Sequence, residues 1–406
     1  MMSKLDELMA RLCPDGVEYK TLGEIATISR GGSLQKKDYV DNGFPCIHYG
    51  QIYTYYNLFA DKTTQFISEE LAKKQRKAAP NDIIMAVTSE NIEDVCKCIA
   101  WLGNDEVAVS GHTAIIKHSL DPKYLAYYFH SSQFYQQKIK LAHGTKVIEV
   151  SPNSLKAIKI PIPPLEIQRE IVRILDNFTE LTAELTAELT ARKQQYEYYR
   201  NRLLSFEGGQ IEWMPLHNVV KKHCTGATPK KGNPSYYVGG TVPWIRTQDV
   251  RFNEIASASS YITETAVKET GAKWIPPNCV IVAISGATAG RCAVNKISAT
   301  TNQHCLNMEI DDTKAFYQFV FYCLCNQYEE LIRKKQGARG DLNASMILNM
   351  NIPVPSREEQ KKIAYTLYQF DSLCNDISVG LPAEIEARQQ QYEYYRDKLL
   401  TFKHKQ

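Results

Sequence analysis

The segment RKQQYEYYRNRLLSF at 192–206 decides the architecture of this chain, because it is written again as RQQQYEYYRDKLLTF at 388–402. The heptapeptide QQYEYYR is identical in the two copies, and its flanks keep the same order of basic and apolar residues. A repeat whose flanks also match indicates the duplication of a larger unit. The chain therefore consists of two related halves, each ending in this tyrosine-rich segment.

The similarity between the halves extends over nearly the whole chain and keeps the same order in both. In each half, a module with short apolar runs precedes a Pro-rich stretch and a long charged segment with regularly spaced leucines. This order predicts a unit of one module and one long helix, present twice. The matching pairs are FPCIHYGQI (44–52) with VPWIRTQDV (242–250), NDIIMAVTS (81–89) with NCVIVAISG (278–286), and PIPPLEIQREI (161–171) with PVPSREEQKKI (353–363).

The two modules have the pattern of mixed α/β structure. Short runs of β-forming residues are separated by Gly, Pro and Asn turns, and one helix is predicted to close each module, over 122–142 and over 313–335. The predicted fold class is α+β: two α/β modules separated by two long antiparallel coiled-coil helices, related by an internal pseudo-two-fold repeat. The predicted domains are module 1 (1–160), the first long helix with its TAEL repeat (161–208), module 2 (209–352) and the second long helix (353–406).

Each long segment carries an apolar seam whose steps alternate between four and three residues, as in a coiled coil. In the first segment, the duplicated tetrapeptide TAELTAEL at 182–189 adds a four-residue stutter to this alternation. In the second, Gly380 and Pro382 predict a kink or break. The predicted seam residues are Leu185, Leu189, Tyr196, Tyr199 and Leu203 in the first segment, and Ile385, Tyr392, Tyr395 and Leu399 in the second.

The register of the tyrosine-rich segment favours helix packing over stacking on bases. Tyr196 and Tyr199 continue the seam, whereas other residues of the segment fall outside it. These outward positions form one set in each copy, and the two sets are related by the approximate two-fold symmetry of the repeat. They are Glu197, Tyr198 and Arg200 in the first copy, and Glu393, Tyr394 and Arg396 in the second.

Composition excludes several classes of protein. The 406 residues are 44% hydrophobic and 23% charged, with a formal charge of +3, which fits a globular protein that neither requires nor excludes nucleic acid. No apolar run is long enough to span a membrane, and the N-terminus lacks the apolar core of a secretion signal. The 11 cysteines have no disulfide-framework spacing. We expect a cytoplasmic protein with reduced thiols.

The chain lacks the motifs of common catalytic sites. There is no Walker loop, and no His, Cys or Asp spacing is typical of a metal site. The tetrapeptide NPSY at 233–236 is similar to the Asn-Pro-Pro-Tyr signature of amino-methyltransferases, but it lacks the second Pro and no glycine-rich cofactor loop precedes it. The lone histidines His112 and His304 are expected to serve core or interface packing. These absences favour a binding protein over an enzyme.

The module ending in IPIPPLEIQREIVRILDNF, the TAELTAEL repeat and the doubled QYEYYR segment together resemble the specificity subunit of type I DNA restriction-modification enzymes. The resemblance covers essentially the whole chain. It departs from the usual pattern at Ser356 and Arg357, where the first copy has Pro164 and Leu165. It implies a non-catalytic subunit whose two target recognition domains each read half of a bipartite double-stranded DNA site with an unread spacer. It also implies docking of two methyltransferase subunits and of motor-nuclease restriction subunits, and S-adenosylmethionine, ATP and Mg belong to those partners.

The repeat itself suggests which residues contact DNA. Polar side chains after equivalent strands offer donors and acceptors for base edges, and lysines and arginines in the flanking loops are suited to phosphates. The candidates for bases are His48, Tyr49, Gln51, Ser89, Glu90 and Asn91 in module 1, and Arg246, Gln248, Asp249, Ser285 and Arg291 in module 2. The candidates for phosphates are Lys36, Lys37 and Lys146 in module 1, and Lys230, Lys231 and Arg339 in module 2.

Two other functions remain to be distinguished from this prediction. A stand-alone regulatory or structural DNA-binding protein would share the modules but have no methyltransferase partner, so co-purification with such a partner separates the two. The hypothesis of a self-sufficient methyltransferase is disfavoured because the cofactor loop is missing. Binding of S-adenosylmethionine by the purified chain alone would revive that hypothesis.

Overall fold

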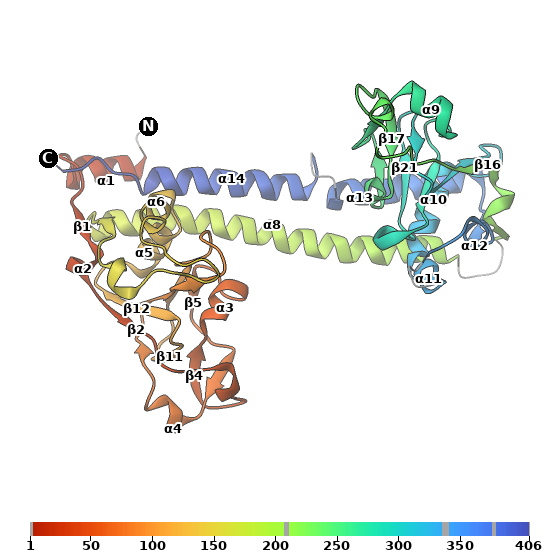
Figure 1. The fold of residues 1–406 in the computed structure, drawn as a ribbon. Coiled ribbons are helices and arrows are strands. Elements are labelled where there is room, and N and C mark those ends of the chain that lie inside the picture. Colours follow the sequence, from red (N-terminus) through yellow and green to blue (C-terminus); the bar gives the residue numbers. More distant parts are fainter. Residues whose placement is uncertain (1–2, 207–210, 335–340, 376–378, 406) are drawn as a thin grey trace. The chain divides into compact units, whose positions relative to one another are not determined.

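The computed structural model describes residues 3–206, 211–334, 341–375 and 379–405, and these form two compact units (Figure 1). Unit 1 comprises Met1–Thr186 and Glu384–Gln406, and unit 2 comprises Ala187–Ala383. The boundary on the first long helix falls inside the TAEL repeat. Each unit therefore combines one module with helical segments from both halves of the chain.

Unit 1 contains two five-stranded sheets and two short strand pairs. The first sheet has the order β2-β12-β8-β10-β5, with β2 at Ala26–Arg30, β12 at Thr113–His118, β8 at Ile83–Ala86, β10 at Cys98–Trp101 and β5 at Phe59–Ala60. The second has the order β3-β6-β4-β11-β7, with β3 at Tyr39–Val40, β6 at Gln65–Ile67, β4 at Phe44–Ile47, β11 at Val107–Val109 and β7 at Lys77–Ala78. The pairs are β1 (Tyr19–Thr21) with β14 (Lys159–Pro161) and β9 (Thr88–Ser89) with β13 (Ile148–Glu149).

Unit 2 repeats this plan with fewer strands in its second sheet. The first sheet has the order β16-β23-β20-β21-β18, with β16 at Val220–Thr225, β23 at Cys305–Ile310, β20 at Val280–Ala283, β21 at Cys292–Asn295 and β18 at Asn253–Ile255. The second has the order β19-β17-β22, with β19 at Tyr261–Ile262, β17 at Val242–Ile245 and β22 at Thr300–Thr301. The strand β15 (Trp213–Pro215) pairs with β24 (Asn351–Pro353).

The helix predicted to close each module is divided into two helices. In unit 1, α5 (Pro122–Phe129) is followed by α6 (Ser132–Lys138), and in unit 2, α10 (Tyr317–Asn326) is followed by α11 (Tyr328–Arg333). The prediction of one continuous helix was wrong because Ser131 acts as a new N-cap, its hydroxyl accepting from the N–H of Phe134 at 3.3 Å. The buried tyrosines of α5 nonetheless lie in the core, as expected.

The long helices follow the predicted pattern of one continuous and one interrupted segment. Helix α8 (Leu165–Ser205) has 41 residues, about 60 Å of helix. The second segment is divided into α13 (Arg357–Asn375) and α14 (Leu381–Leu399), so the break predicted from Gly380 and Pro382 is confirmed. The predicted α+β class, with two modules and long helices, is confirmed as well.

Inside each unit, two antiparallel helix segments pack through the same pair of aromatic rings. In unit 1, Phe178 of α8 stacks on Tyr395 of α14, with ring centroids 5.4 Å apart and planes at 21°. In unit 2, Tyr199 of α8 stacks on Phe370 of α13, with centroids 5.6 Å apart and planes at 23°. Tyr196 and Tyr392 are buried in the cores of their units. The tyrosine-rich segment of one half thus packs against the helix start of the other half.

The seam is less regular than its sequence pattern. Leu204 is 3% exposed and lies in the core of unit 2, while its neighbour Leu203 is only half-buried. Near the middle of the long segments, Leu181 is 47% exposed and Leu373 is 39% exposed. Leu185, Leu189, Ile385 and Leu399 are half-buried. The aromatic ends of each helix pair are therefore packed more tightly than the leucine-rich middle.

A buried glutamine joins each long helix to the α/β module of its unit. The Oε1 atom of Gln168 accepts from the N–H of Asp121 at 2.9 Å, and its amide nitrogen donates to the Pro163 carbonyl at 2.7 Å. Gln360 makes the matching bonds to the N–H of Phe316 and the Pro355 carbonyl, at 2.7 and 2.9 Å. Both glutamines are 1% exposed. The side chain is needed because it satisfies two backbone groups at the Pro-rich start of the helix.

Candidate nucleic-acid interface

In module 1, the predicted residues His48, Tyr49 and Gln51 lie where strand β4 ends and helix α3 (Tyr49–Thr54) begins. His48 is the N-cap, and its Nδ1 accepts from the N–H of Gly50 at 3.2 Å. The Gln51 side chain accepts from the N–H of His48 at 2.8 Å and donates to Thr64 at 3.0 Å. Burial lowers the pKa of His48, and the charges of Lys36 and His112 lower it further. A lowered pKa favours the neutral imidazole, and because Nδ1 accepts from Gly50, the other ring nitrogen, Nε2, carries the proton and can donate.

A ring cluster joins these residues to the end of strand β8. The Tyr49 ring lies 4.5 Å from the His48 ring and 4.9 Å from the His112 ring. The Nδ1 atom of His112 lies 3.1 Å from the Thr88 hydroxyl, next to the predicted contact Ser89. His112 itself is exposed. Of the core or interface packing expected for His112, the core role is wrong, because the residue lies at a turn between strands that opens to solvent, and the interface role stays a prediction.

The loop from Ser89 to Lys97 carries Glu90 and Asn91 and is held from below by a buried lysine. The Lys138 ammonium donates to the carbonyls of Glu93 and Val95 at 2.7 and 2.6 Å. Burial lowers its pKa. Glu90 is exposed, whereas the Asn91 amide is already engaged with Asp94 at 2.8 Å. Of the polar residues in this loop, Glu90 therefore presents a freer acceptor than Asn91 does.

The predicted phosphate-binding lysines of module 1 are exposed. Lys36 and Lys37 lie in the short helix η1 (Lys36–Asp38), and the effect of Lys36 on the pKa of His48 places it near the ring cluster. Lys146 lies in the loop before β13, and β13 pairs with β9 through Ile148 opposite Ser89. Lysines thus flank the polar cluster from two separate loops.

In module 2, Arg246 takes the place of His48 at the end of strand β17. It is the N-cap of η4 (Thr247–Asp249), and its N–H donates to the Asp249 carboxylate at 2.9 Å. The guanidinium lies 5.8 Å from the Trp244 ring and 3.4 Å from the Ser259 hydroxyl. Its buried Nε has no hydrogen-bond partner among the described residues. Asp249 is occupied as a cap, while Gln248 is exposed.

Ser285 and Arg291 flank a glycine-rich turn after strand β20. Ser285 is the N-cap of η5 (Gly286–Thr288), and the backbone N–H of Arg291 donates to the Thr288 carbonyl at 3.0 Å. The Arg291 side chain is half-buried, and its Nε also lacks a partner within the described ranges. Module 2 therefore offers two arginines with unused donors where module 1 offers histidine and tyrosine.

In each module, a glycine just before the lysine pair lets the backbone pass very close to a neighbouring segment. A Cβ at Gly31 would lie 2.0 Å from the Ser110 carbonyl oxygen, and one at Gly226 would lie 1.8 Å from the Thr301 oxygen. Only glycine allows so close an approach. Lys230 and Lys231 follow shortly after Gly226, as Lys36 and Lys37 follow shortly after Gly31, and all four lysines are exposed. Arg339 lies outside the described residues.

Matching backbone hydrogen bonds assemble the two sites in the same way. The N–H of Ser110 donates to the Ile47 carbonyl at 3.1 Å, and the N–H of Asn302 donates to the Ile245 carbonyl at 3.0 Å. These bonds bring His112 and His304 beside the ends of β4 and β17. Both histidines are exposed, so a core role is wrong for His304 as well, and its interface role stays a prediction. Sequence reasoning missed these two positions because a lone histidine carries no spacing signal.

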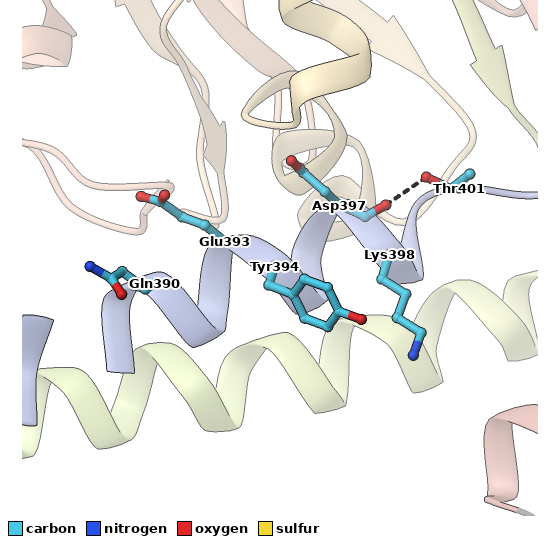
Figure 2. A pocket seen from close by; sticks show the side chains of 6 residues that line it. All are labelled: Gln390, Glu393, Tyr394, Asp397, Lys398 and Thr401. Carbon is cyan, nitrogen blue, oxygen red and sulfur yellow. Dashed lines mark hydrogen bonds between the residues drawn. The ribbon is translucent and has the colours of Figure 1, made fainter. Parts of the chain in front are cut away.

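The outward face of the tyrosine-rich segment is exposed in both copies. Tyr198 is 58% exposed and Tyr394 is 62% exposed. Around Tyr394, a shallow hollow lies along α14, and Figure 2 shows the Tyr394 ring and the Lys398 side chain extending from the helix. The arginines differ from the expectation, because Arg200 and Arg396 lie over the rings of Tyr196 and Tyr392, at 5.4 and 5.6 Å.

Three further observations bear on the chemistry of the chain. Within the described ranges, no group of His, Cys, Asp and Glu side chains could hold a metal ion. The search of those ranges for a helix long and apolar enough to cross a membrane found none. The cysteines are free thiols, and most are buried.

Comparison with known proteins gives consistent matches over the full length. The family model described as type I restriction modification DNA specificity domain matches residues 14–192 and 210–387. The chain is 34% identical over 421 residues to the Escherichia coli type I restriction enzyme EcoR124I/EcoR124II specificity subunit, covering 99% of this chain and 97% of that protein. It is 29% identical over 321 residues to the Haemophilus influenzae putative type I restriction enzyme specificity subunit S.HindORF215P, covering 74% of this chain and 76% of that one.

Solved structures share the fold at low sequence identity. The S subunit of a type I restriction-modification system from M. genitalium aligns with a TM-score of 0.57 at 14% identity, covering 95% of this chain and 96% of that one. A chain from a solved type I R-M system aligns with a TM-score of 0.64 at 16% identity, covering 96% and 98%. These likenesses concern the arrangement of modules and long helices.

Proposed function

The chain belongs to the type I restriction-modification DNA specificity family, and we propose that it recognises a bipartite double-stranded DNA target, one half-site in each module. Proteins of this family are specificity subunits, so the chain is a DNA-recognition subunit and not itself an enzyme. In this proposal the modules span 1–160 and 209–352, the segments 161–208 and 353–406 are spacers, and the protein acts in the cytoplasm.

The observation that carries this proposal is the duplication of one polar site at matching strand ends. His48 and Arg246 each cap the turn after a strand, beside an exposed histidine and a loop with two lysines. Donors and acceptors at the centre suit the base edges of the major groove, and lysines at the margin suit phosphates. Because the central residues differ, the two modules read different bases.

The long helices hold the two modules and dock the catalytic partners. The exposed Tyr198 and Tyr394, with Glu197 and Glu393 beside them, form two copies of one outward surface. Two identical methyltransferase subunits bind these copies, and motor-nuclease restriction subunits join the assembly through them. S-adenosylmethionine, ATP and Mg are supplied by those partners.

The TAEL repeat sets the length of the unread spacer. Four residues lengthen a helix by about 6 Å and rotate it by about 40° net of a full turn. One base pair advances about 3.4 Å and turns about 34–36°. The repeat is regular in its side-chain bonding, since the Thr182 and Thr186 hydroxyls each donate to the carbonyl four residues earlier, at 2.9 and 2.8 Å. One tetrapeptide therefore corresponds to about one base pair.

Deleting one TAEL unit, residues 186–189, tests this function directly. We expect the spacer to shorten by about one base pair while both half-sites keep their bases. Long-read mapping of methylated adenines, in a host that expresses the variant with its methyltransferase partner, measures both quantities. Altered half-site bases would contradict the spacer role, and failure of the chain to co-purify with a methyltransferase would favour a stand-alone DNA-binding protein.

A further inference from the structure

Unit 1 contains a short N-terminal helix that has no counterpart in the sequence repeat. Helix α1 (Lys4–Leu12) begins with a capping box between Ser3 and Asp6. Its apolar residues Leu5, Leu8, Met9 and Leu12 follow the spacing of a helix that binds in a groove. Leu8 is buried in the core of unit 1, and the other three pack against that core.

Two ion pairs attach the ends of α1 to the start of helix α8. The Lys4 ammonium lies 2.9 Å from the Glu170 carboxylate, and the Arg11 guanidinium lies 2.7 Å from Glu166. The pKa of Glu170 is lowered to about 2, first by the hydrogen bond from Arg173 and also by Lys4. Helix α1 therefore binds the start of α8 through an apolar stripe and two oppositely charged contacts.

The surface under α1 is built from both long helices of unit 1. Ile167 and Ile171 of α8, together with Leu400 and Phe402 at the end of α14, belong to the same buried cluster as Leu8. Asp6 of α1 lies close enough to Lys398 for that lysine to lower its pKa. The start of one long helix and the end of the other thus create a site for a third helix.

Among the described residues, unit 2 leaves a groove at the matching surface. Its volume is about 460 Å³, and it lies between the end of α8 and the start of α13. Its apolar lining includes Leu203, Phe206 and Ile363, and its charged margin includes Arg202 and Lys362. Both margin residues are exposed.

The sequence repeat aligns the two surfaces with one change inside the lining, where Ile167 of unit 1 corresponds to Glu359 of unit 2. Within the paired segments PIPPLEIQREI and PVPSREEQKKI, Ile171 corresponds to Ile363 and Glu170 corresponds to Lys362. Within the tyrosine-rich segments, the lining residue Phe206 corresponds to Phe402. The unit 2 groove therefore has the geometry of a helix site, since its counterpart in unit 1 holds a helix.

Charge distinguishes the occupant of this groove from α1 itself. A second copy's α1 seated in the same manner would place Lys4 against Lys362, a repulsive pair. A helix with a carboxylate in its first turn would pair with Lys362, and a basic residue in its last turn would pair with Glu358, the counterpart of Glu166. This order of charges also suits the helix dipole at both ends.

We propose that the groove between the end of α8 and the start of α13 binds an amphipathic helix of a partner protein, with a leucine stripe and an acidic first turn. The two ends of the repeat are then not equivalent: unit 1 fills its helix site with its own α1, and unit 2 takes its helix in trans. This inference stands apart from DNA recognition and does not require that the proposed half-sites be correct.

Two stapled peptides and the full chain test the proposal. The probes are residues 3–13 in the native sequence and the same peptide with Lys4→Glu, each stapled on its exposed face because so short a helix does not form alone. Fluorescence anisotropy measures their binding to the wild-type chain, to Lys362→Glu, and to Lys361→Glu as a control with the same charge change outside the groove lining. We expect the Lys4→Glu peptide to bind the wild type and the control about fivefold more tightly than the native peptide.

The Lys362→Glu variant should reverse this preference, and Thr366→Arg, which fills the groove, should abolish binding of both peptides. A preference that persists in Lys362→Glu, or binding that survives Thr366→Arg, would overturn the proposal, since the peptides would then bind elsewhere. Self-association of the full chain that the native peptide inhibits would also overturn it, because the occupant would be a second copy's α1.

Discussion

Units 1 and 2 share their helix packing and differ in the chemistry that they bury beneath it. The stacked pairs Phe178–Tyr395 and Tyr199–Phe370 have nearly the same geometry. At the end of α5 in unit 1, the His130 imidazole lies 3.2 Å from the Cys98 carbonyl. At the corresponding place in unit 2, the thiols of Cys325 and Cys292 lie 3.6 Å apart. The duplication has kept the helix contacts, while at this place one module interior holds an imidazole and the other holds a pair of thiols.

The same contrast appears at the proposed DNA-contacting sites. Module 1 places the rings of His48, Tyr49 and His112 together, and module 2 places Arg246 and Arg291 at the matching strand ends. Backbone hydrogen bonds assemble both sites in the same way, so the difference lies in the side chains alone. In the proposed function, this common frame with exchanged side chains lets one architecture read two sequences.

Replacing the buried glutamines tests the shared frame and should have the largest effect. Gln168→Leu leaves the N–H of Asp121 and the Pro163 carbonyl without their partner, which should cost unit 1 about 3 kcal/mol of unfolding free energy. Gln360→Leu should cost unit 2 a similar amount. Hydrogen exchange at increasing urea concentration, read peptide by peptide, measures each unit separately.

The exposed Gln389 provides the matched control for these variants. Its amide donates to the exposed Glu393 at 3.1 Å on the helix surface, so Gln389→Leu should change stability by less than about 0.5 kcal/mol. If either buried variant destabilised both units equally, the two helix-to-module joints would not be independent.

Arg246→Ala tests the contrast between the two sites. Loss of a bidentate base contact should relax one base position in the module 2 half-site by roughly 1–3 kcal/mol and leave the module 1 half-site unchanged. Lys230→Ala should instead weaken binding to all sequences and reduce the salt slope by about 1. Binding of the assembled complex to a DNA library at several salt concentrations separates these outcomes. A change in the module 1 half-site would contradict the assignment.

Acid should destabilise unit 1 through its buried histidines. The loss of stability per histidine at mildly acidic pH is the smallest change predicted here. Burial lowers the pKa of His118 and of His130 to about 4, below the ordinary value of 6.5. The unfolded chain therefore takes up protons first, and stability present above pH 6.5 is lost as pH falls toward 4. Each histidine should cost about 1.5 kcal/mol at pH 5.5.

His118→Ile isolates this effect, because Ile310 stands at the corresponding end of strand β23 in unit 2. The variant should lose about half of the acid sensitivity of unit 1, measured by hydrogen exchange between pH 7 and pH 5. An unchanged pH dependence would show that other groups cause it.

The long-range organisation could be predicted from sequence because the chain is duplicated. Aligning its two halves shows which segments are equivalent and in what order they occur. The Pro-rich starts, the TAEL repeat and the doubled tyrosine segment predicted two modules, the long helices and the break near Gly380, and the fold class was confirmed. The division between α5 and α6 at Ser131 was not predicted, because a single serine in an aromatic-rich run is too weak a signal for a new N-cap. Helix α1 was missed as well, because it lies outside the repeat. The proposed DNA contacts and the domain boundaries stay predictions.

Sequence by itself determined what repeats: the order of module and helix, the apolar seam and the tyrosines that extend it. These follow from spacing, because helix and strand periods are local properties of the chain. Only the tertiary structure decided which copy packs against which helix start, that His112 and His304 are exposed beside the strand ends, and that α1 covers the start of α8 while the described residues leave a groove at the start of α13. Such facts depend on contacts between residues far apart in the chain, and no local period encodes them.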